Sequence, residues 1–143
     1  MIKRSCSNQP FLLLMQTARV IQEQIRDDMT KFNLSITDFS VLEVLFHKGK
    51  QTIQQIGKSI LISSGSMTYV IDKLEQKGLL KRNACPDDRR VIHVTLSDTG
   101  LELMNVIMPK HKKFVDDTFD SLDINELDTL VLLLKKLKEE VVK

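Results

Sequence analysis

The sequence predicts a mainly α-helical fold with one small β-hairpin. Apolar residues recur at three- and four-residue steps over most of the 143 residues, and this helical period changes to alternation only near residues 80–96. The 42% hydrophobic and 28% charged content is typical of a folded protein, and a chain of this length can bury a sizeable core. We therefore expect a single domain over residues 1–143.

Two helices are expected in the first third of the chain. The first covers about residues 8–30, where the apolar residues with helical period are Phe11, Leu14, Met15, Ala18, Ile21, Ile25 and Met29. The second follows a turn, and either Ser35 or Thr37 is suited to cap it. Gly49 suits the left-handed residue past its end. The inward residues of the second helix are expected to be Phe39, Leu42, Leu45 and Phe46.

Two short helices separated by a tight polar turn come next. Thr52 is suited to cap the first, and the second follows the turn at residues 62–65. Their expected inward residues are Ile53, Ile56, Ile60, Met67, Val70, Ile71 and Leu74. Alternation at residues 80–84 and 91–96 then predicts two strands, joined by a polar loop.

The last third is again helical. Ser97 is suited to cap a long helix, and Asp123 with Glu126 forms a capping-box pattern that opens the final one. The apolar stripe of the final helix is Leu127, Leu130, Val131, Leu134, Leu137 and Val141. The first and last helices carry more apolar surface than a small domain needs to cover, which favours a homodimer. Packing on their own domain is the alternative.

The charge is unevenly distributed along the chain. The net charge is +2, but residues 48–95 carry nine basic and four acidic side chains, so this segment is +5 and the rest is −3. A basic segment between neutral or acidic flanks is suited to bind a polyanion such as nucleic acid. A solvated charged face is the alternative.

The order of short helix, tight turn, helix and hairpin resembles the MarR family of winged helix-turn-helix regulators over nearly the whole chain. The most specific match is the family's wing pattern, Asp-x-Arg followed by Leu-Ser-x-x-Gly, which is filled by Asp88, Arg90, Leu96, Ser97 and Gly100. Residues 60–68 and 74–78 also match its recognition-helix region. The resemblance implies a winged helix-turn-helix DNA-reading part over residues 35–97. It also implies a helical dimerisation part over residues 8–30 and 98–143.

The candidate DNA-binding residues lie in the second short helix and in the hairpin. Short hydroxyl side chains at a helix N-terminus suit phosphates and base edges in the major groove. An arginine at the wing suits the minor groove, with Asp88 to aim Arg90, and Lys73, Arg82 and Arg89 are expected at phosphates. The candidates are Thr52, Ser64, Ser66, Thr68, Tyr69, Lys73, Arg82, Asp88, Arg89 and Arg90. Helix capping is the alternative for the serines, and a solvated hairpin tip for the wing.

The resemblance also implies an effector, a small aromatic or phenolic molecule or an oxidant. Residues 54–57, 68–77 and 83–90 look most like the branch of the family associated with quinone and catechol responses. Cys85, just before the wing loop, and Cys6 are candidate redox-sensing residues. Cys6 lies several residues before the position of the reactive cysteine in peroxide-sensing members. Chemically inert cysteines are the alternative for both.

Several function classes are not expected. The chain has no Gly-rich phosphate loop, nucleophile elbow or His-Glu-x-x-His motif, so we expect no enzyme, cofactor or metal. Two cysteines are too few for a disulfide scaffold, and no membrane span or signal peptide is evident, so a cytoplasmic protein is expected. We predict a regulator, most simply a repressor, that binds double-stranded DNA at an inverted repeat. A winged-helix module that binds protein is the main alternative.

Overall fold

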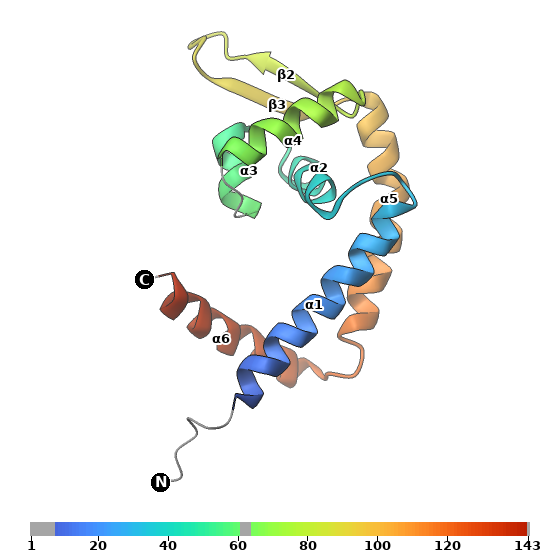
Figure 1. Cartoon of the computed structure of the whole chain (residues 1–143), viewed down its shortest axis with the longest axis vertical. Coiled ribbons are helices and arrows are strands. Elements are labelled where there is room, and N and C mark those ends of the chain that lie inside the picture. The colour runs from blue at the N-terminus through green and yellow to red at the C-terminus, as the bar shows by residue number, and fades with distance from the viewer. Residues whose placement is uncertain (1–7, 61–63, 143) are drawn as a thin grey trace. The chain divides into compact units, whose positions relative to one another are not determined.

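In the computed structural model, residues 8–60 and 64–142 are described, with the backbone alone at Ser64 and Gly65. This part of the chain folds into helices and short strands in the following order (Figure 1): α1 (Gln9–Thr30), α2 (Ile36–Lys48), β1 (Gln51–Thr52), α3 (Ile53–Ile60), α4 (Ser64–Gln76), β2 (Leu80–Ala84), β3 (Ile92–Leu96), α5 (Asp98–Thr118) and α6 (Ile124–Val141). The predicted mainly α-helical class with a small wing is confirmed. The chain forms two compact units, residues 1–105 and residues 106–143.

Side-chain caps define where α2 and α3 begin. Ser35, and not Thr37, caps α2: its Oγ accepts a hydrogen bond from the Asp38 N–H at 2.9 Å, and the Ser35 N–H donates to Asp38 Oδ2 at 2.9 Å. Thr52 and Gln55 form the same reciprocal pair at the start of α3. Gly49, at φ 72°, ends α2 as predicted. The turn predicted at residues 62–65 lies partly outside the described residues, and α4 begins within it at Ser64.

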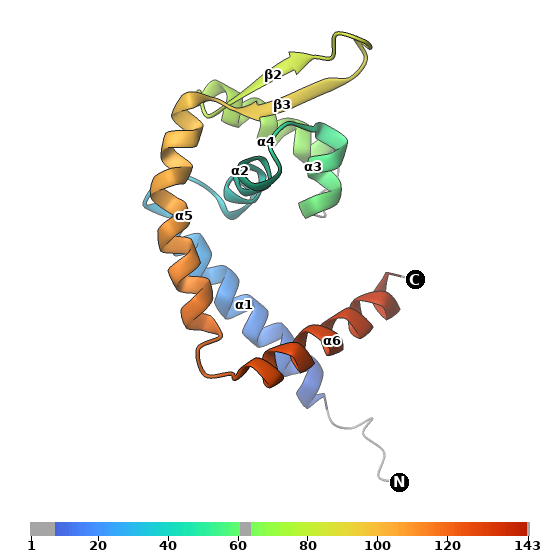
Figure 2. The ribbon, with the colours of Figure 1, turned by 180° about the vertical axis from the view of Figure 1, so that it is seen from behind.

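The sheet has three antiparallel strands in the order β1-β3-β2, one strand more than the predicted hairpin. The register of the hairpin pairs Leu80 with Leu96 and Ala84 with Ile92. The additional strand β1 pairs Thr52 with His93. Two residues are too short for a period, so β1 left no pattern in the sequence. Its effect is to join the residues just before α3 to strand β3 of the wing. Figure 2 shows the hairpin of β2 and β3 from behind.

The elements from α2 to β3, residues 35–97, are called the central fold below. Its core is built from the predicted inward faces, since the side chains at Met67, Val70, Ile71 and Leu74 of α4 are all buried. Of the predicted α3 face, Ile56 is fully buried, whereas Ile53 and Ile60 are half-buried. Helix α4 packs on α2 and α3, and it also contacts β2. The face of α4 opposite these contacts is therefore exposed to solvent.

The end of the wing is joined tightly to the start of α5. Ser97 caps α5 as predicted, because its Oγ accepts from the Gly100 N–H at 3.0 Å, while the Ser97 N–H donates to the Leu79 carbonyl at 3.1 Å. A Cβ at Gly100 would overlap the Leu79 carbonyl oxygen. The glycine of the wing pattern thus permits a close backbone approach.

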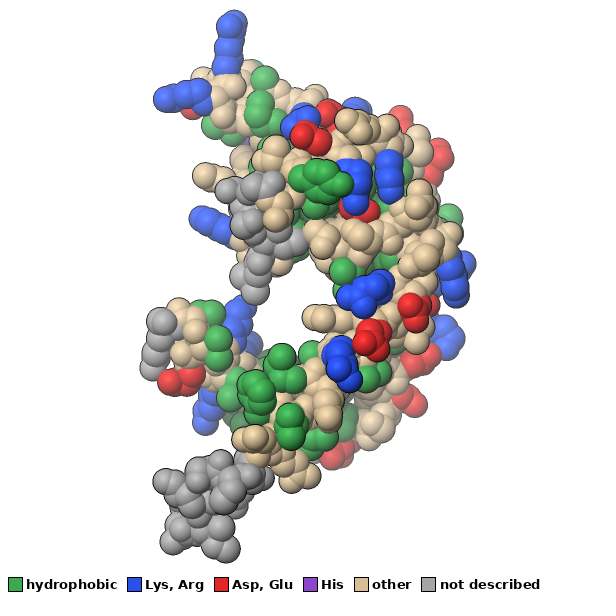
Figure 3. Space-filling model, viewed as in Figure 1, with side chains coloured by type: hydrophobic (Ala, Val, Ile, Leu, Met, Phe, Trp, Pro, Cys, Tyr) green, Lys and Arg blue, Asp and Glu red, His purple; other side chains and the backbone are tan. Residues whose placement is uncertain are grey.

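The terminal helices α1 and α6 expose much of their apolar surface. Hydrophobic side chains gather over the first half of α1 (Figure 3), where those of residues 11–15 are all at least 42% exposed. In the second unit, α6 begins at the predicted Asp123 capping box and has no buried residue. Its large exposed side chains are Ile124, Val131, Leu132, Leu133, Leu134, Leu137 and Val141. No helix within residues 8–60 and 64–142 is long and apolar enough to cross a membrane.

Candidate nucleic-acid interface

The outer face of α4 carries the predicted polar and aromatic side chains. Ser66 and Thr68 are exposed, and Tyr69 is 68% exposed, because the neighbouring positions 67, 70 and 71 point into the core. The side chain of Ser64 lies outside the described residues. The helix period therefore places Ser66, Thr68 and Tyr69 on the surface of the helix that the resemblance identifies as the recognition helix.

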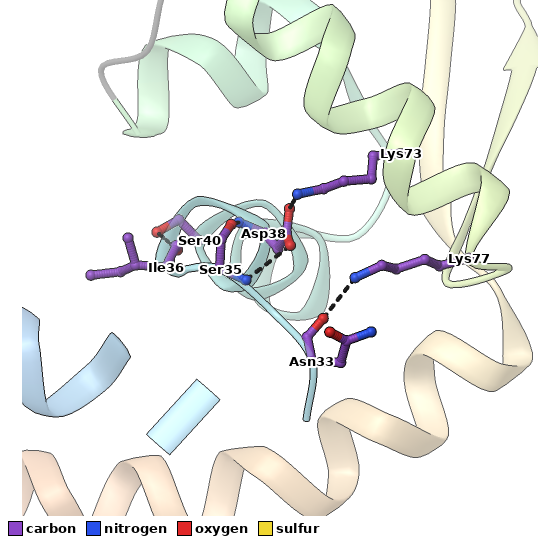
Figure 4. Close-up of polar contacts among 7 residues, drawn as sticks. All are labelled: Asn33, Ser35, Ile36, Asp38, Ser40, Lys73 and Lys77. Atoms are coloured by element: carbon purple, nitrogen blue, oxygen red, sulfur yellow. Dashed lines mark hydrogen bonds and ion pairs between the residues drawn. The ribbon is translucent and has the colours of Figure 1, made fainter. Parts of the chain in front are cut away.

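Lys73 of α4 and Lys77, the residue that follows this helix, contact the first turn of α2 and the segment before it (Figure 4). The Lys73 ammonium lies 3.0 Å from Oδ1 of Asp38, a carboxylate that is only 1% exposed. It also lies 5.8 Å from the centre of the Tyr69 ring. Lys77 Nζ donates to the Asn33 carbonyl at 2.6 Å. One basic group of the recognition helix and one just past its end are thus engaged within the chain.

Arg82 of β2 is engaged in the same way on the other side of α4. Its Nη2 lies 2.6 Å from Asp72 Oδ1 and donates to Glu75 Oε1 at 2.8 Å, and its Nε donates to the same Glu75 oxygen at 3.2 Å. The hydrogen bond to Glu75 is the main reason that the pKa of Arg82 is raised, and the hydrogen bond to Asp72 adds to it. This network joins the wing to the recognition helix.

The tip of the wing presents basic side chains to solvent (Figure 3). Arg90 is 90% exposed, and its Nε and Nη2 donate to the two Asp88 carboxylate oxygens at 3.1 and 3.2 Å. The Arg90 N–H also donates to Asp88 Oδ1 at 3.0 Å. The bonds from the Arg90 side chain, and then from its N–H, lower the pKa of Asp88. The expected contact between the two residues is present, while Arg89 beside them is exposed.

Strand β1 brings one more candidate, Thr52, to the wing. Thr52 is half-buried, and its Oγ1 accepts from the Gln55 N–H at 3.1 Å. An open hollow of about 540 Å³ lies between the start of α3 and the wing. It is lined by Thr52, Ile53, Gln54, Asp88, Arg90, Val91 and Ile92. Thr52 and Arg90, which are far apart in the sequence, therefore share one concave surface.

Of the two candidate redox-sensing cysteines, only Cys85 lies within the described residues. Cys85 is half-buried at the base of the wing loop, where its N–H donates to the Val91 carbonyl at 2.9 Å, and it forms no disulfide. Cys6 lies outside the described residues. A redox role for either residue stays a prediction.

Sequence reasoning missed the acceptors that hold the lysines and Arg82. Asp38 follows Ser35 by three residues, which is a capping-box spacing and the one available signal. No local pattern links Asp38 to Lys73, because the two lie on different helices far apart in the sequence. The sequence shows Asp72 and Glu75 only as two of the four acidic side chains of residues 48–95, and nothing in it indicates that they bind Arg82.

Comparison with known proteins identifies the family. A model of the MarR family matches residues 34–92. The chain is 43% identical over 126 residues to the HTH-type transcriptional regulator MhqR of Bacillus subtilis, covering 88% of this chain and 87% of the relative. It is 42% identical over 117 residues to the uncharacterized HTH-type regulator YkoM of the same organism, covering 82% and 75%.

Solved structures agree with this fold. AbsC, a MarR family transcriptional regulator from Streptomyces coelicolor, superposes with a TM-score of 0.88 at 23% identity, over 99% of this chain and 97% of AbsC. BpsR of Bordetella bronchiseptica gives a TM-score of 0.79 at 26% identity, over 91% and 98%. Regulators of this family bind DNA and act as dimers. The chain belongs to the MarR family and is a DNA-binding transcriptional regulator, not an enzyme.

Proposed function

We propose that the chain is a repressor that binds an inverted-repeat operator as a homodimer and is released by a small phenolic or quinone-like ligand or an electrophile. The observation that carries the proposal is the exposed polar face of α4 beside a wing whose Arg90 is held by Asp88. A recognition helix and a basic wing can engage neighbouring grooves of one duplex. A repressor of this kind would act by occupying promoter DNA.

Helix α4 would read the major groove. Ser64, Ser66 and Thr68 stand in its first turns, where short hydroxyl groups and free backbone N–H groups suit phosphates and base edges. Tyr69, exposed on the next position, offers a ring and a hydroxyl to the same surface. The small size of the first three side chains would let the helix lie deep in the groove.

The wing would contact the adjacent minor groove. The Arg90 guanidinium is exposed but oriented by two hydrogen bonds to Asp88, so less conformational entropy is lost when it enters a narrow, electronegative groove. Arg89 at the tip and Thr52 on the facing strand are proposed phosphate contacts.

A second copy of the chain would cover the apolar faces of α1 and α6. The exposed leucine, valine and phenylalanine side chains of these helices favour association with a partner of matching surface. A two-fold dimer places two recognition helices about one DNA turn apart, which requires an operator with inverted symmetry.

A small aromatic effector is supported by one relative. The DNA binding of BpsR is regulated by 6-hydroxynicotinic acid, a small aromatic acid. The chain is also 26% identical over 93 residues to the organic hydroperoxide resistance transcriptional regulator of Bacillus subtilis, which keeps an electrophile or oxidant as the second kind of signal. For that second kind, Cys85 is the described residue to test.

The first experiment is selection of bound duplexes from a random DNA pool, with the mass of the protein in solution measured in parallel. We expect an enriched inverted repeat and a particle of twice the chain mass. No enrichment by a folded dimer would favour a protein-binding module instead. On the selected duplex, Arg90→Ala should weaken binding by about 1–3 kcal/mol at fixed salt. Unchanged affinity would mean that the wing does not dock.

The selected duplex then serves to test the effector. Phenols, quinones and peroxides are titrated into the complex, and release is followed by fluorescence anisotropy. Cys85→Ser separates the two kinds of signal. If the variant is still released fully by a quinone, non-covalent binding and not reaction at Cys85 is the mechanism.

A further inference from the structure

The two edges of α4 carry opposite charges. Lys73 lies on one edge of the helix, and Lys77, four residues later and just past the helix end, follows on the same side, while Asp72 and Glu75 lie on the other edge. The buried side chains of α4 lie between these edges. The side chains of each edge form polar contacts with a different part of the chain.

On the lysine edge, Lys73 is paired with the first turn of α2. Asp38 is almost fully buried, and its Oδ2 is used by the Ser35 N–H of the capping box. Its Oδ1 receives no hydrogen bond from the described residues, and the Lys73 ammonium 3.0 Å away forms an ion pair with it. A buried carboxylate that depends on one ammonium disfavours withdrawal of that ammonium, because the charge would be left uncompensated.

Lys77, just past the end of α4, binds the turn that joins α1 to α2. Its ammonium donates to the carbonyl of Asn33, whose φ of 58° reverses the chain after α1. The Asn33 and Leu34 N–H groups donate to the carbonyls of Thr30 and Met29, so the turn also closes the end of α1. Lys73 therefore joins α4 to the first turn of α2, and Lys77 joins the end of α4 to the turn before α2, as Figure 4 shows.

The carboxylate edge is paired with the wing. Arg82 of β2 binds both Asp72 and Glu75, and its N–H contacts Glu75 Oε2 at 3.4 Å. The recognition helix is thus held by charged contacts on both edges, with lysines directed to the turn and carboxylates directed to the wing. Three of the nine basic side chains of residues 48–95 are used in this way.

We propose that Lys73, Lys77 and Arg82 are positioning residues that set the orientation of α4, and that they do not contact DNA phosphates in the complex. The proposal rests on the proposed function, because it concerns how the same helix reads DNA. The phosphate contacts are then left to cations that the described residues do not pair, of which Arg89 at the wing tip is the clearest.

The dependence of operator binding on salt tests this division. The logarithm of the binding constant falls with the logarithm of salt concentration by about 0.9 for each phosphate contact, so one contact per protomer contributes about 1.8 to the slope of a dimer. Lys73→Met and its matched control Arg89→Met are titrated beside the wild-type chain on the selected operator and on a scrambled duplex. The double variant Asp38→Asn with Lys73→Met removes the buried charge together with its partner, which keeps the test usable if Lys73→Met alone fails to fold.

We expect both Lys73→Met variants to give lines parallel to the wild-type line but displaced to weaker operator binding by about tenfold, with a smaller ratio of operator to scrambled binding. Arg89→Met should instead reduce the slope by about 1.8. Lys73→Arg, which preserves the ion pair, should restore the ratio. A purely structural role would leave slope and ratio unchanged once the folded fraction is equal.

Two results would overturn the inference while leaving the proposed function intact. One is a slope that falls on Lys73→Met as it does on Arg89→Met, which would identify Lys73 as a phosphate contact. The other is an unchanged ratio of operator to scrambled binding in both Lys73→Met variants. A wild-type chain that selects no operator would overturn the proposed function itself, and the inference with it.

Discussion

The central fold and the terminal helices use the same apolar residue types with the same helical period, yet the central fold buries far more of them in the single chain. Leu42 of α2 is 0% exposed, whereas Leu137 of α6 is 50% exposed. Both residues belong to amphipathic stripes of similar appearance. The difference is that α2 is surrounded by α3, α4 and β3, while α6 has no buried residue. A stripe therefore indicates a helix that needs a partner, and not whether the partner lies in the same chain.

The capping boxes repeat the comparison at smaller scale. Ser35 with Asp38 and Asp123 with Glu126 have the same reciprocal pair of hydrogen bonds. Asp38 is buried and paired with Lys73, whereas Glu126 is exposed and serves its own helix. The local motif is the same in both helices, but the surroundings of Asp38 add an ion pair with Lys73 to its capping hydrogen bonds.

The largest expected effect is on the core of the central fold. Leu42→Ala should lower the free energy of unfolding by about 3 kcal/mol, because a cavity forms where the side chain was fully enclosed. Urea unfolding at two protein concentrations is the measurement. The loss should be similar at both, since the site lies within one chain. A loss that appears only at low concentration would place Leu42 at an interface.

Leu137→Asp tests the uncovered stripe of α6. The substitution should weaken self-association by at least about 2 kcal/mol, because a two-fold interface receives the change twice. Sedimentation equilibrium measures the dimer dissociation constant, and Lys136→Asp, at an exposed position of the same helix, is the matched control. Equal dissociation constants for both variants would show that this stripe is not covered by a second copy.

The two capping boxes provide a smaller and sharper test. Asp38→Asn should cost about 1–2 kcal/mol, because the buried ion pair with Lys73 is lost while Lys73 remains partly solvated. Glu126→Gln should cost less than about 0.5 kcal/mol, because its carboxylate is exposed. Urea unfolding of the two variants at one high protein concentration gives the comparison. Equal losses in the free energy of unfolding would mean that the buried ion pair between Asp38 and Lys73 adds no stability beyond that of an exposed capping box.

The smallest expected effect concerns the ion pair at the exposed wing. Arg90 lowers the pKa of Asp88 in the folded chain, so the contact is fully present above the ordinary aspartate pKa of 3.8 and is lost as pH falls through the lowered value. Arg90→Ala should therefore move the pKa of Asp88 back up toward 3.8. NMR titration of the Asp88 carboxyl carbon measures it. An unchanged titration would show that the pair is not formed in solution.

Most of the fold could be predicted from the sequence because it depends on local chemistry. Helical period placed the buried faces, and Ser35, Thr52, Ser97 and Asp123 marked helix starts through hydrogen bonds within three residues. The contact between Asp88 and Arg90 was predicted for the same reason, since they are close neighbours in the chain. Strand β1 was not predictable, because two residues carry no period and its partner strand lies beyond two helices and the wing loop.

The DNA-binding candidates divide along the same line. Exposure of Ser66, Thr68 and Tyr69 follows from the helix period of α4, which the sequence determines by itself. The engagement of the candidates Lys73 and Arg82 was decided only by the tertiary structure, which brings Asp38, Asp72 and Glu75 within reach. A sequence specifies which side chains are charged, but whether a charge faces solvent or an internal partner depends on what the folded chain places a few ångströms away.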